Sequence, residues 1–578
     1  MMQILSMRAV FAIGLGCLWL FAACSGEDNG GGYTPSCGVA KIVVDPVSGE
    51  LVSGPPNVEL DEITDVSLDP WPQSLTRIEI RDGFWRLEQD VVDKGAPAPE
   101  TAVRILVWMS MQGYSEFTGW LDRLYDPTQA DYLAFASSSC IAKEFGPEPQ
   151  KLGRSIAYLE HYGLRVDRIA KNRMIFWATG TVAQVEAAFQ TTLHSIVRIK
   201  RADYAALTPL TVPDFMAGHM EAVLGMQVLP TNLTPPPDPG TQETTVPSSG
   251  IRFSEIADVY GLSPLYQAGQ KGKGQSIGIM AGWAGRMSDI QEYLRVMGIE
   301  RTGAITDVYT DFPPEKFADE TTVNTQLAAA IAPDADILLY HSADNTDLSL
   351  CWALNEAIGE GKVSAISTSY AHQEATVSWE IQEFMSRAAR FAAAQGITFI
   401  SASGDSREVD APGNSPWVTS IGSTILTLDE NGQRKTEVDA WFGGRGRSAL
   451  FAKPDYQSAL DPEGTRRLTV DLAMHCFPGN AEFAIMSYLR GTWFPNGGTS
   501  LVAPILAGMV GCVNQARGEK GRIGFINRAL YTVPEFQASF YDVTTGLFDV
   551  GGKEVGKGWD YGTGWGAPNM SAWIPTIP

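Results

Sequence analysis

The hydrophobic and polar positions in the second half of the chain predict short buried strands that alternate with helices. Four apolar runs are predicted as strands: Ser276–Met280, Asp336–Tyr340, Val363–Ser367 and Ile397–Ser401. The stretches between them are predicted as helices: Asp289–Met297, Asp319–Ile331 and Trp379–Ala394. Fully apolar strands that alternate with helices are typical of an α/β fold with a doubly wound parallel sheet. Functional groups in such folds gather at the carboxyl ends of the strands.

The first half of the chain has a different, α+β pattern, which predicts a separate domain over residues 76–229. Its predicted strands and helices, in chain order, are Val103–Met109, Pro149–Gly163, Arg173–Ala178 and Val182–Phe189. A proline-rich stretch with few apolar residues, 230–250, follows as an exposed linker that is open to proteolysis. Residues 25–75 are rich in proline, glycine and acidic residues, so we expect a poorly ordered tether there.

Residues 1–24 have the pattern of an export signal. Arg8 precedes an apolar stretch, Ala9–Ala23, that is too short to span a bilayer comfortably. The small residues before Cys24 and the polar segment after it resemble the lipobox of bacterial lipoproteins, in which Cys24 would carry the lipid. Phe21 stands where an aliphatic residue is usual, so ordinary signal cleavage remains an alternative. We expect an exported protein: an outer-membrane or cell-surface lipoprotein, or an extracellular protein.

Composition and charge limit the number of domains and the kinds of partner that we expect. The chain has 578 residues, 44% of them hydrophobic, which is enough for two or three domains with large cores. A formal net charge of −23 argues against nucleic acid as a partner. The cysteines show neither a zinc spacing nor a disulfide framework, and a single bridge cannot be assigned from the sequence. We expect a monomer.

Ser500 is the strongest candidate for a catalytic residue. It follows Gly497-Gly498-Thr499, and the apolar run Leu501–Val510 after it is predicted as a buried helix. A hydroxyl at a helix start lies beside free N–H groups that can hold an oxyanion. The alternative is a serine that caps a core helix.

Several segments of the first domain resemble the activation prodomain of the sedolisin (serine-carboxyl peptidase) family, of the pro-kumamolisin type. They are Asp122–Pro127, Phe145–Pro147, Tyr158–Leu164 and Ala178–Phe189. The resemblance implies a ferredoxin-like α+β prodomain before a subtilisin-like catalytic domain over residues 251–578. It also implies an acid-active endopeptidase zymogen that acts on polypeptides, is held by its own prodomain and is cleaved in or near the linker.

The same resemblance assigns roles to individual residues. Ser500 matches the nucleophile that forms an acyl-enzyme, Glu320 the general base and Asp405 the oxyanion-hole acid. A glutamate base suits acid conditions, because a histidine would already be protonated there. The resemblance further implies a Ca²⁺ site near the C-terminus, formed by Asp542, Val543, Gly556, Gly558 and Asp560.

Asn324 departs from the family pattern, which has an aspartate one helical turn after the glutamate. Its amide can donate a hydrogen bond to Glu320 but cannot share a proton with it, so we expect a weaker base. A catalytically weak or silent peptide-binding lipoprotein is therefore the alternative function. Tripeptidyl-peptidase action also stays open, because side-chain pockets cannot be read from the sequence.

Overall fold

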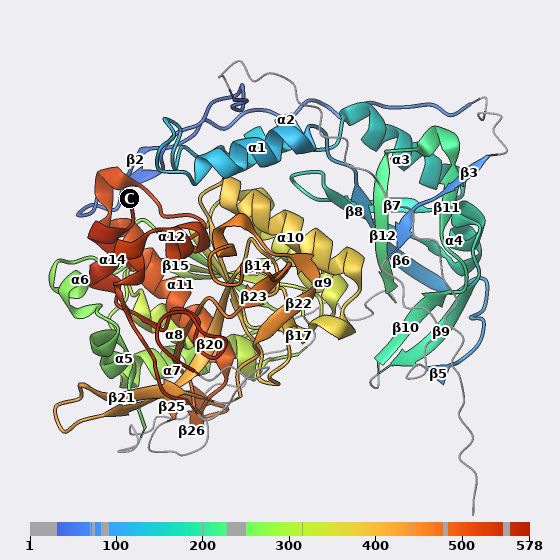
Figure 1. Cartoon of the computed structure of the whole chain (residues 1–578). Coiled ribbons are helices and arrows are strands. Elements are labelled where there is room, and N and C mark those ends of the chain that lie inside the picture. The colour runs from blue at the N-terminus through green and yellow to red at the C-terminus, as the bar shows by residue number, and fades with distance from the viewer. Residues whose placement is uncertain are drawn as a thin grey trace, which may run out of the picture.

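The computed structural model shows two domains side by side, the smaller at the right of Figure 1 and the larger at the left. The described residues are 32–69, 71, 76–82, 92–198, 201–227, 250–314, 316–440, 442–477, 484–546 and 555–578. The predicted export segment and most of the predicted linker lie outside these residues.

A five-stranded sheet forms the centre of the first domain, in the order β4-β12-β6-β8-β7. Its main elements follow the chain order strand, helix, two strands, helix, strand: β6 (Ala102–Met109), α3 (Pro149–His161), β7 (Arg165–Ile169), β8 (Ile175–Thr181), α4 (Val182–Phe189) and β12 (Met220–Gln227). These four strands pair antiparallel, and the short β4 (Arg81–Asp82) pairs parallel to β12. This is the predicted ferredoxin-like arrangement.

Strand β6 shows how this sheet serves two cores. Val103, Ile105 and Val107 point into the core between the sheet and its own helices. Leu106 and Trp108, on the other face, belong to the core that is shared with the second domain. Successive side chains of a strand point to opposite faces, so apolar residues on both faces of β6 place the sheet between two packed layers.

Smaller elements complete the first domain. The strands are β3 (Arg77–Glu79), β5 (Val92–Asp93), β9 (Leu193–Arg198), β10 (Arg201–Ala206) and β11 (Thr211–Pro213). Two helices, α1 (Tyr114–Leu124) and α2 (Ser138–Phe145), extend over the second domain, as the top of Figure 1 shows.

An eight-stranded sheet forms the centre of the second domain. Seven strands run in the order β14-β15-β13-β16-β18-β20-β21, and the eighth, β24, pairs with β20. All neighbours from β14 to β20 are parallel, and the last pair is antiparallel. The bounds are β13 (Ser276–Ala281), β14 (Ile305–Tyr309), β15 (Asp336–His341), β16 (Ala365–Thr368), β18 (Thr398–Ala402), β20 (Thr419–Leu428), β21 (Arg434–Asp439) and β24 (Leu472–His475). The predicted parallel sheet is confirmed.

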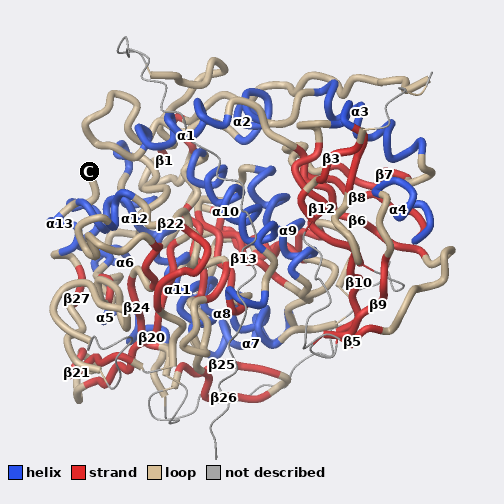
Figure 2. The backbone as a smooth tube through the Cα atoms, turned by 45° about the vertical axis from the view of Figure 1, so that its right-hand side comes forward, coloured by secondary structure: helices blue, strands red, loops and turns tan. Residues whose placement is uncertain are grey.

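Helices cover this sheet in two groups. One group contains α7 (Met287–Val296), α8 (Asp319–Ile331) and α11 (Thr499–Ala516). The other contains α9 (Asp347–Glu360) and α10 (Trp379–Ala394), which pack together beside the first domain (Figures 1 and 2). Among the described helices only α11 is long and apolar enough to cross a membrane, but 89% of it is buried inside the protein. It is the central core helix.

The two domains meet through ion pairs and aromatic side chains. Arg104 of β6 pairs with Asp311, Lys171 pairs with Glu360, and Arg81 pairs with Glu383. Trp108 meets the edge of the Phe384 ring at a centroid distance of 5.4 Å. Each of these pairs joins a residue of the first domain to one of the second.

The structure corrects the expected disorder before residue 76. Residues 32–69 follow a defined path, with a hairpin of β1 (Val43–Val44) and β2 (Leu51–Ser53) and a disulfide between Cys37 and Cys140. Composition suggested disorder because this segment is rich in proline, glycine and acidic residues. It is held instead by the disulfide and by hydrogen bonds to both domains, which composition does not report.

Candidate active site

The candidate catalytic residues lie where the parallel strands of the second domain end. Glu320 follows β14 in the first turn of α8, and Asp405 lies three residues after β18. Ser500 lies in the first turn of α11, which packs against α8. Residues from three parts of the sequence thus come to one edge of the sheet, as expected for this fold class.

Gly498 sets the position of Ser500. It has φ 120° and is the residue before the first turn of α11. A Cβ atom there would lie 2.9 Å from Asp405 Oδ2. Glycine is therefore required both for this backbone conformation and for the close approach of the carboxyl group.

Asp405 sits at the start of the same helix. Its Oδ1 accepts a hydrogen bond from Thr499 N at 2.8 Å and another from Thr499 Oγ1 at 2.9 Å. Its side chain is exposed to solvent. Free N–H groups and the positive end of the helix dipole favour a carboxyl group at this place.

Burial raises the pKa of Glu320 above its usual value, and the charge of Asp405 raises it further. Hydrogen bonding to Ser500, Asn324 and Ser369 acts in the opposite direction but does not outweigh burial. Oε1 of Glu320 is buried and has no partner of normal hydrogen-bond geometry. The three candidate catalytic groups are therefore close enough to act on one another, with the base only loosely held.

Ser369 is a member of this cluster that the sequence did not reveal. Asn324 Nδ2 donates to Ser369 Oγ at 2.8 Å, and Ser369 Oγ donates to the Ser500 carbonyl at 2.8 Å. The serine directly follows β16, so its place at the carboxyl end of a central strand was the available signal. Asn324 Oδ1 is buried and unpaired.

An open cleft of about 460 Å³ adjoins Glu320 and Ser369. Trp283, Phe317 and Tyr370 supply aromatic side chains to its lining. An open cleft of this size with aromatic sides suits an extended peptide.

The loop that carries Asp405 is shaped by a second acid. Gly404 has φ 87°, and a Cβ atom on it would lie 1.6 Å from Asp410 Oδ2. Burial raises the pKa of Asp410 to about 7, and its Oδ1 is buried without a partner. The loop can hold this course only with glycine at position 404.

Two histidines of the second domain contact carboxylates. His341 is completely buried, and its Nε2 lies 2.7 Å from Asp307 Oδ1. His372 lines the cleft, with Nδ1 2.7 Å from Asp347 Oδ1.

The residues expected to bind Ca²⁺ come together in the C-terminal loops. Asp542 Oδ2 accepts from Gly558 N at 3.0 Å, and Asp560 Oδ2 accepts from Gly556 N at 3.1 Å. Asp542 Oδ1 is buried without a partner, so this carboxylate has an oxygen free for a hard cation, whereas Val543 is buried beside it. No group of three or more His, Cys, Asp or Glu side chains suited to a metal occurs among the described residues. The set fits Ca²⁺ only as two carboxylates supplemented by backbone oxygens.

Comparison with known proteins finds relatives along most of the chain. Residues 89–229 match the family described as "Pro-kumamolisin, activation domain". The chain is 26% identical to sedolisin of Pseudomonas sp. (strain 101) over 82% of this chain and 88% of that protein. It is 26% identical to kumamolisin of Bacillus sp. (strain MN-32), over 86% and 96%. Tripeptidyl-peptidase 1 of Bos taurus is 24% identical, over 85% and 94%.

One solved structure supports the fold. It is Pseudomonas sedolisin, a serine-carboxyl proteinase, complexed with two molecules of pseudo-iodotyrostatin. The TM-score is 0.51 at 23% identity, and the match covers 57% of this chain and 99% of that one. The catalytic-domain fold predicted from the sequence is thus confirmed.

Proposed function

Since the chain belongs to the sedolisin family of serine-carboxyl peptidases and carries that family's activation domain, we propose that it is an exported, acid-active endopeptidase made as a zymogen. One observation carries this proposal. Ser500, Glu320 and Asp405 lie close enough for the pKa of Glu320 to respond to both other groups.

In the proposed reaction Ser500 Oγ attacks the carbonyl carbon of the scissile peptide bond. The hydroxyl proton passes to the Glu320 carboxylate and then to the leaving amine, which gives an acyl-enzyme and the first product. Water attacks the acyl group in the second half, with Glu320 again taking the proton. A raised pKa makes Glu320 a stronger base than an exposed glutamate once it is ionised.

Asp405 is proposed to stabilise the oxyanion. An ionised carboxylate would repel the developing negative charge, so the proton on Asp405 must be present during the attack. Thr499 already binds Oδ1, which leaves Oδ2, on the side of Gly498, to carry that proton. This requirement for a protonated acid in the oxyanion hole supports an activity that is confined to acidic solution.

Asn324 and Ser369 are proposed to hold the base and the nucleophile in place. The amide cannot share a proton with Glu320, but it fixes Ser369, which in turn binds the Ser500 carbonyl. Helix α8 is linked to helix α11 in this way. The unpaired Oδ1 of Asn324 and the unpaired Oε1 of Glu320 favour the second candidate, a slow or silent homologue that binds peptides.

A direct experiment separates the two candidates. The purified chain and its Ser500→Ala variant are incubated near pH 4 and compared on a gel, with a denatured protein added as substrate. A peptidase shortens itself within or near residues 230–250 and digests the substrate, and the variant does neither. Identical gels for both proteins would leave peptide binding as the function.

Two accessory features complete the proposal. Ca²⁺ bound by Asp542 and Asp560, with backbone oxygens of Val543, Gly556 and Gly558, would clamp the C-terminal loops. A lipid on Cys24 would anchor the exported protein to a membrane surface, and ordinary cleavage would release it instead. Endopeptidase action is favoured by the open cleft, whereas a tripeptidyl-peptidase needs a closed end that binds the substrate N-terminus.

A further inference from the structure

Residues 32–69 precede the family-matched region and connect the two domains. We call them the N-terminal strap. Along the top of Figure 1 the strap follows α1 and α2 and reaches β2 near the C-terminus of the chain. Hairpin β1–β2 of the strap therefore lies against the domain that the prodomain is expected to release.

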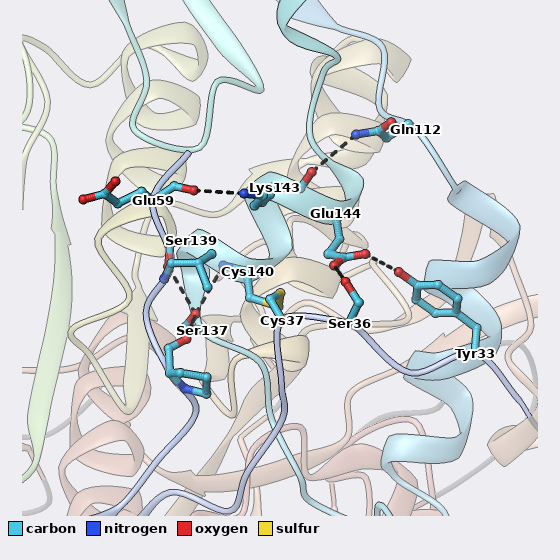
Figure 3. The surroundings of a disulfide bond; sticks show 12 residues. Tyr33, Ser36, Cys37, Glu59, Gln112, Ser137, Ser139, Cys140, Lys143 and Glu144 are labelled. Carbon is cyan, nitrogen blue, oxygen red and sulfur yellow. Dashed lines mark hydrogen bonds between the residues drawn. A yellow bond between two sulfur atoms is a disulfide. The ribbon is translucent and has the colours of Figure 1, made fainter. Parts of the chain in front are cut away.

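One end of the strap is fixed to the prodomain. Cys37 is bonded to Cys140 of α2, and Tyr33 and Ser36 both donate to the Glu144 carboxylate (Figure 3). Further along, Ser137 Oγ donates to the Pro56 carbonyl at 2.7 Å. These contacts lie on both sides of hairpin β1–β2, so they limit the positions that the hairpin can take and favour its docking.

The hairpin docks on the catalytic domain through backbone and amide groups. Gln515 Nε2, at the end of α11, donates to the Pro46 carbonyl at 2.6 Å. Arg522 N donates to the Ile42 carbonyl at 3.1 Å. Gly49 has φ 75°, and a Cβ atom on it would lie 2.6 Å from the Lys273 side chain and 2.9 Å from Gly274 N. The two backbones touch, which is possible only with glycine.

This contact differs in chemistry from the rest of the domain interface. Besides its apolar contacts, the prodomain sheet is held by ion pairs to carboxylates, namely Arg104–Asp311, Lys171–Glu360 and Arg81–Glu383. The docked hairpin depends on carbonyls, amides and peptide N–H groups, which do not titrate. Lys41, Lys273 and Arg522 are the nearby cations, and Glu50 of the hairpin and Glu519 of the turn Gly518–Lys520, which packs on β1, are nearby carboxylates. Asp45 is the carboxylate coupled to Lys273, and hydrogen bonds from Ser48 lower its pKa.

We propose that the N-terminal strap is a docking segment that keeps the prodomain on the catalytic domain after the linker has been cut and after acid has loosened the carboxylate interface. The order of these events rests on the proposed function, whereas the contact between the strap and the catalytic domain does not. A lipid on Cys24 would then hold the processed catalytic domain at the membrane without a continuous chain. Cutting of the linker would then not by itself release the catalytic domain from the prodomain.

The test avoids any need for catalytic activity. A recognition sequence for a sequence-specific protease is placed within residues 230–250 of the Ser500→Ala chain, which is then cut and passed over a sizing column at pH 7 and pH 4. The proposal expects the fragments to elute together at both pH values. Separation of the fragments at pH 4 would overturn it.

A matched pair of glycine variants locates the contact. Gly49→Val forces an L side chain into a left-handed conformation and into Lys273, and it lies on the strap, so the catalytic domain is unaffected. We expect about tenfold or greater loss of co-eluting prodomain at pH 4. Gly54→Val is the control, because a Cβ atom at Gly54 meets only Leu51, at 3.8 Å. Equal behaviour of the two variants would contradict the docking role. Failure of the intact enzyme to process itself would concern the proposed function alone.

Discussion

Asn324 is the residue on which the strength of the catalytic base depends. It lies one helical turn after Glu320, on the same face of α8, and its amide donates a hydrogen bond to Ser369. We expect Asn324→Asp to raise kcat, by on the order of 10²-fold, because a carboxyl group can share the proton that Glu320 receives. Turnover of a quenched peptide near pH 4 measures this.

The control is Asn514→Asp, which places a new carboxyl group in the core on the same helix as Ser500 but away from the site. It should leave kcat unchanged or lower it through lost stability. If Asn324→Asp gave no gain while its folding was unaltered, Asn324 would not occupy the position of the supporting acid.

Ser369 gives a second prediction for a single residue, and it concerns positioning. Ser369→Ala removes the link between Asn324 and the Ser500 carbonyl, so kcat should fall about tenfold or more while KM changes little. Because Ser369 lowers the pKa of Glu320, its replacement should raise that pKa. The acid limb of the rate profile would then move to higher pH.

Ser369→Thr keeps the hydroxyl and should restore the position of the acid limb. Ser367→Ala is the matched control, because Ser367 is buried in β16, the strand that Ser369 directly follows, and its Oγ has no partner. A pH profile that is the same in Ser369→Ala and Ser367→Ala would reduce Ser369 to a packing role.

The elements themselves were predictable where packing and local sequence agree. Helices α4, α8 and α10 occupy the predicted ranges, and α4 has a capping box between Thr181 and Gln184 that marks its start. Helix α9 was missed because it is buried on almost all sides and shows no clear helical period. Strand β14 was missed because it lies at the sheet edge with three of its five residues exposed.

The loop after β18, which carries Asp405, gives a further prediction. Gly404→Ala would place a methyl group against the Asp410 carboxyl group at a backbone conformation that favours glycine. The displaced loop would carry Asp405 away from Ser500, so we expect kcat to fall by on the order of 10²-fold. Gly269→Ala controls for the backbone conformation, because Gly269 has φ 75° and nothing within 4 Å. Equal activity in the two variants would show that the course of the loop after β18 does not affect catalysis.

The C-terminal loops should respond to Ca²⁺. Removal of a ligand present at about 100 times its Kd costs roughly 2.7 kcal/mol, so chelation should lower Tm by about 5 °C or more. Asp542→Asn should abolish this response, because the free oxygen of that carboxylate is the proposed ligand. Asp429→Asn removes a carboxylate that only closes a turn, through Asn431 N and Gln433 N, and should keep the response. If chelator did not change the Tm of the unmodified protein, the proposed Ca²⁺ site would be excluded.

At the scale of the whole molecule, the sequence predicted the two domains but not how they are joined. Periodicity identifies strand β6, yet it does not show that one face of that strand packs on another domain. The strap was hidden for the same reason, since its order comes from long-range contacts. The sequence predicted that Ser500, Glu320 and Asp405 act together only through the family resemblance. Ser369 lies in no motif and was not predicted. Local patterns report local structure, and contacts between distant segments require coordinates.

The domain interface should weaken in acid through identifiable groups. Although burial acts in the opposite direction, hydrogen bonds from Lys171 and Tyr340 lower the pKa of Glu360. A lowered pKa means that this contact stabilises the joined domains above the usual glutamate pKa and is lost as the pH falls through the lowered value. Glu360→Gln removes both the pairing and its pH dependence. We expect it to speed processing at pH 6, where Glu360 is ionised in the unmodified chain, and to have a progressively smaller effect as the pH falls through the lowered pKa.

Processing is followed on a gel as the shortening of the chain over time. Glu430→Gln, in an exposed turn, removes the same charge far from the prodomain and should process like the unmodified chain at both pH values. If Glu360→Gln were as stable as this control at pH 6, the ion pair with Lys171 would not contribute to latency. The acid response would then have to come from Asp311 or Glu383, the other paired carboxylates of the interface.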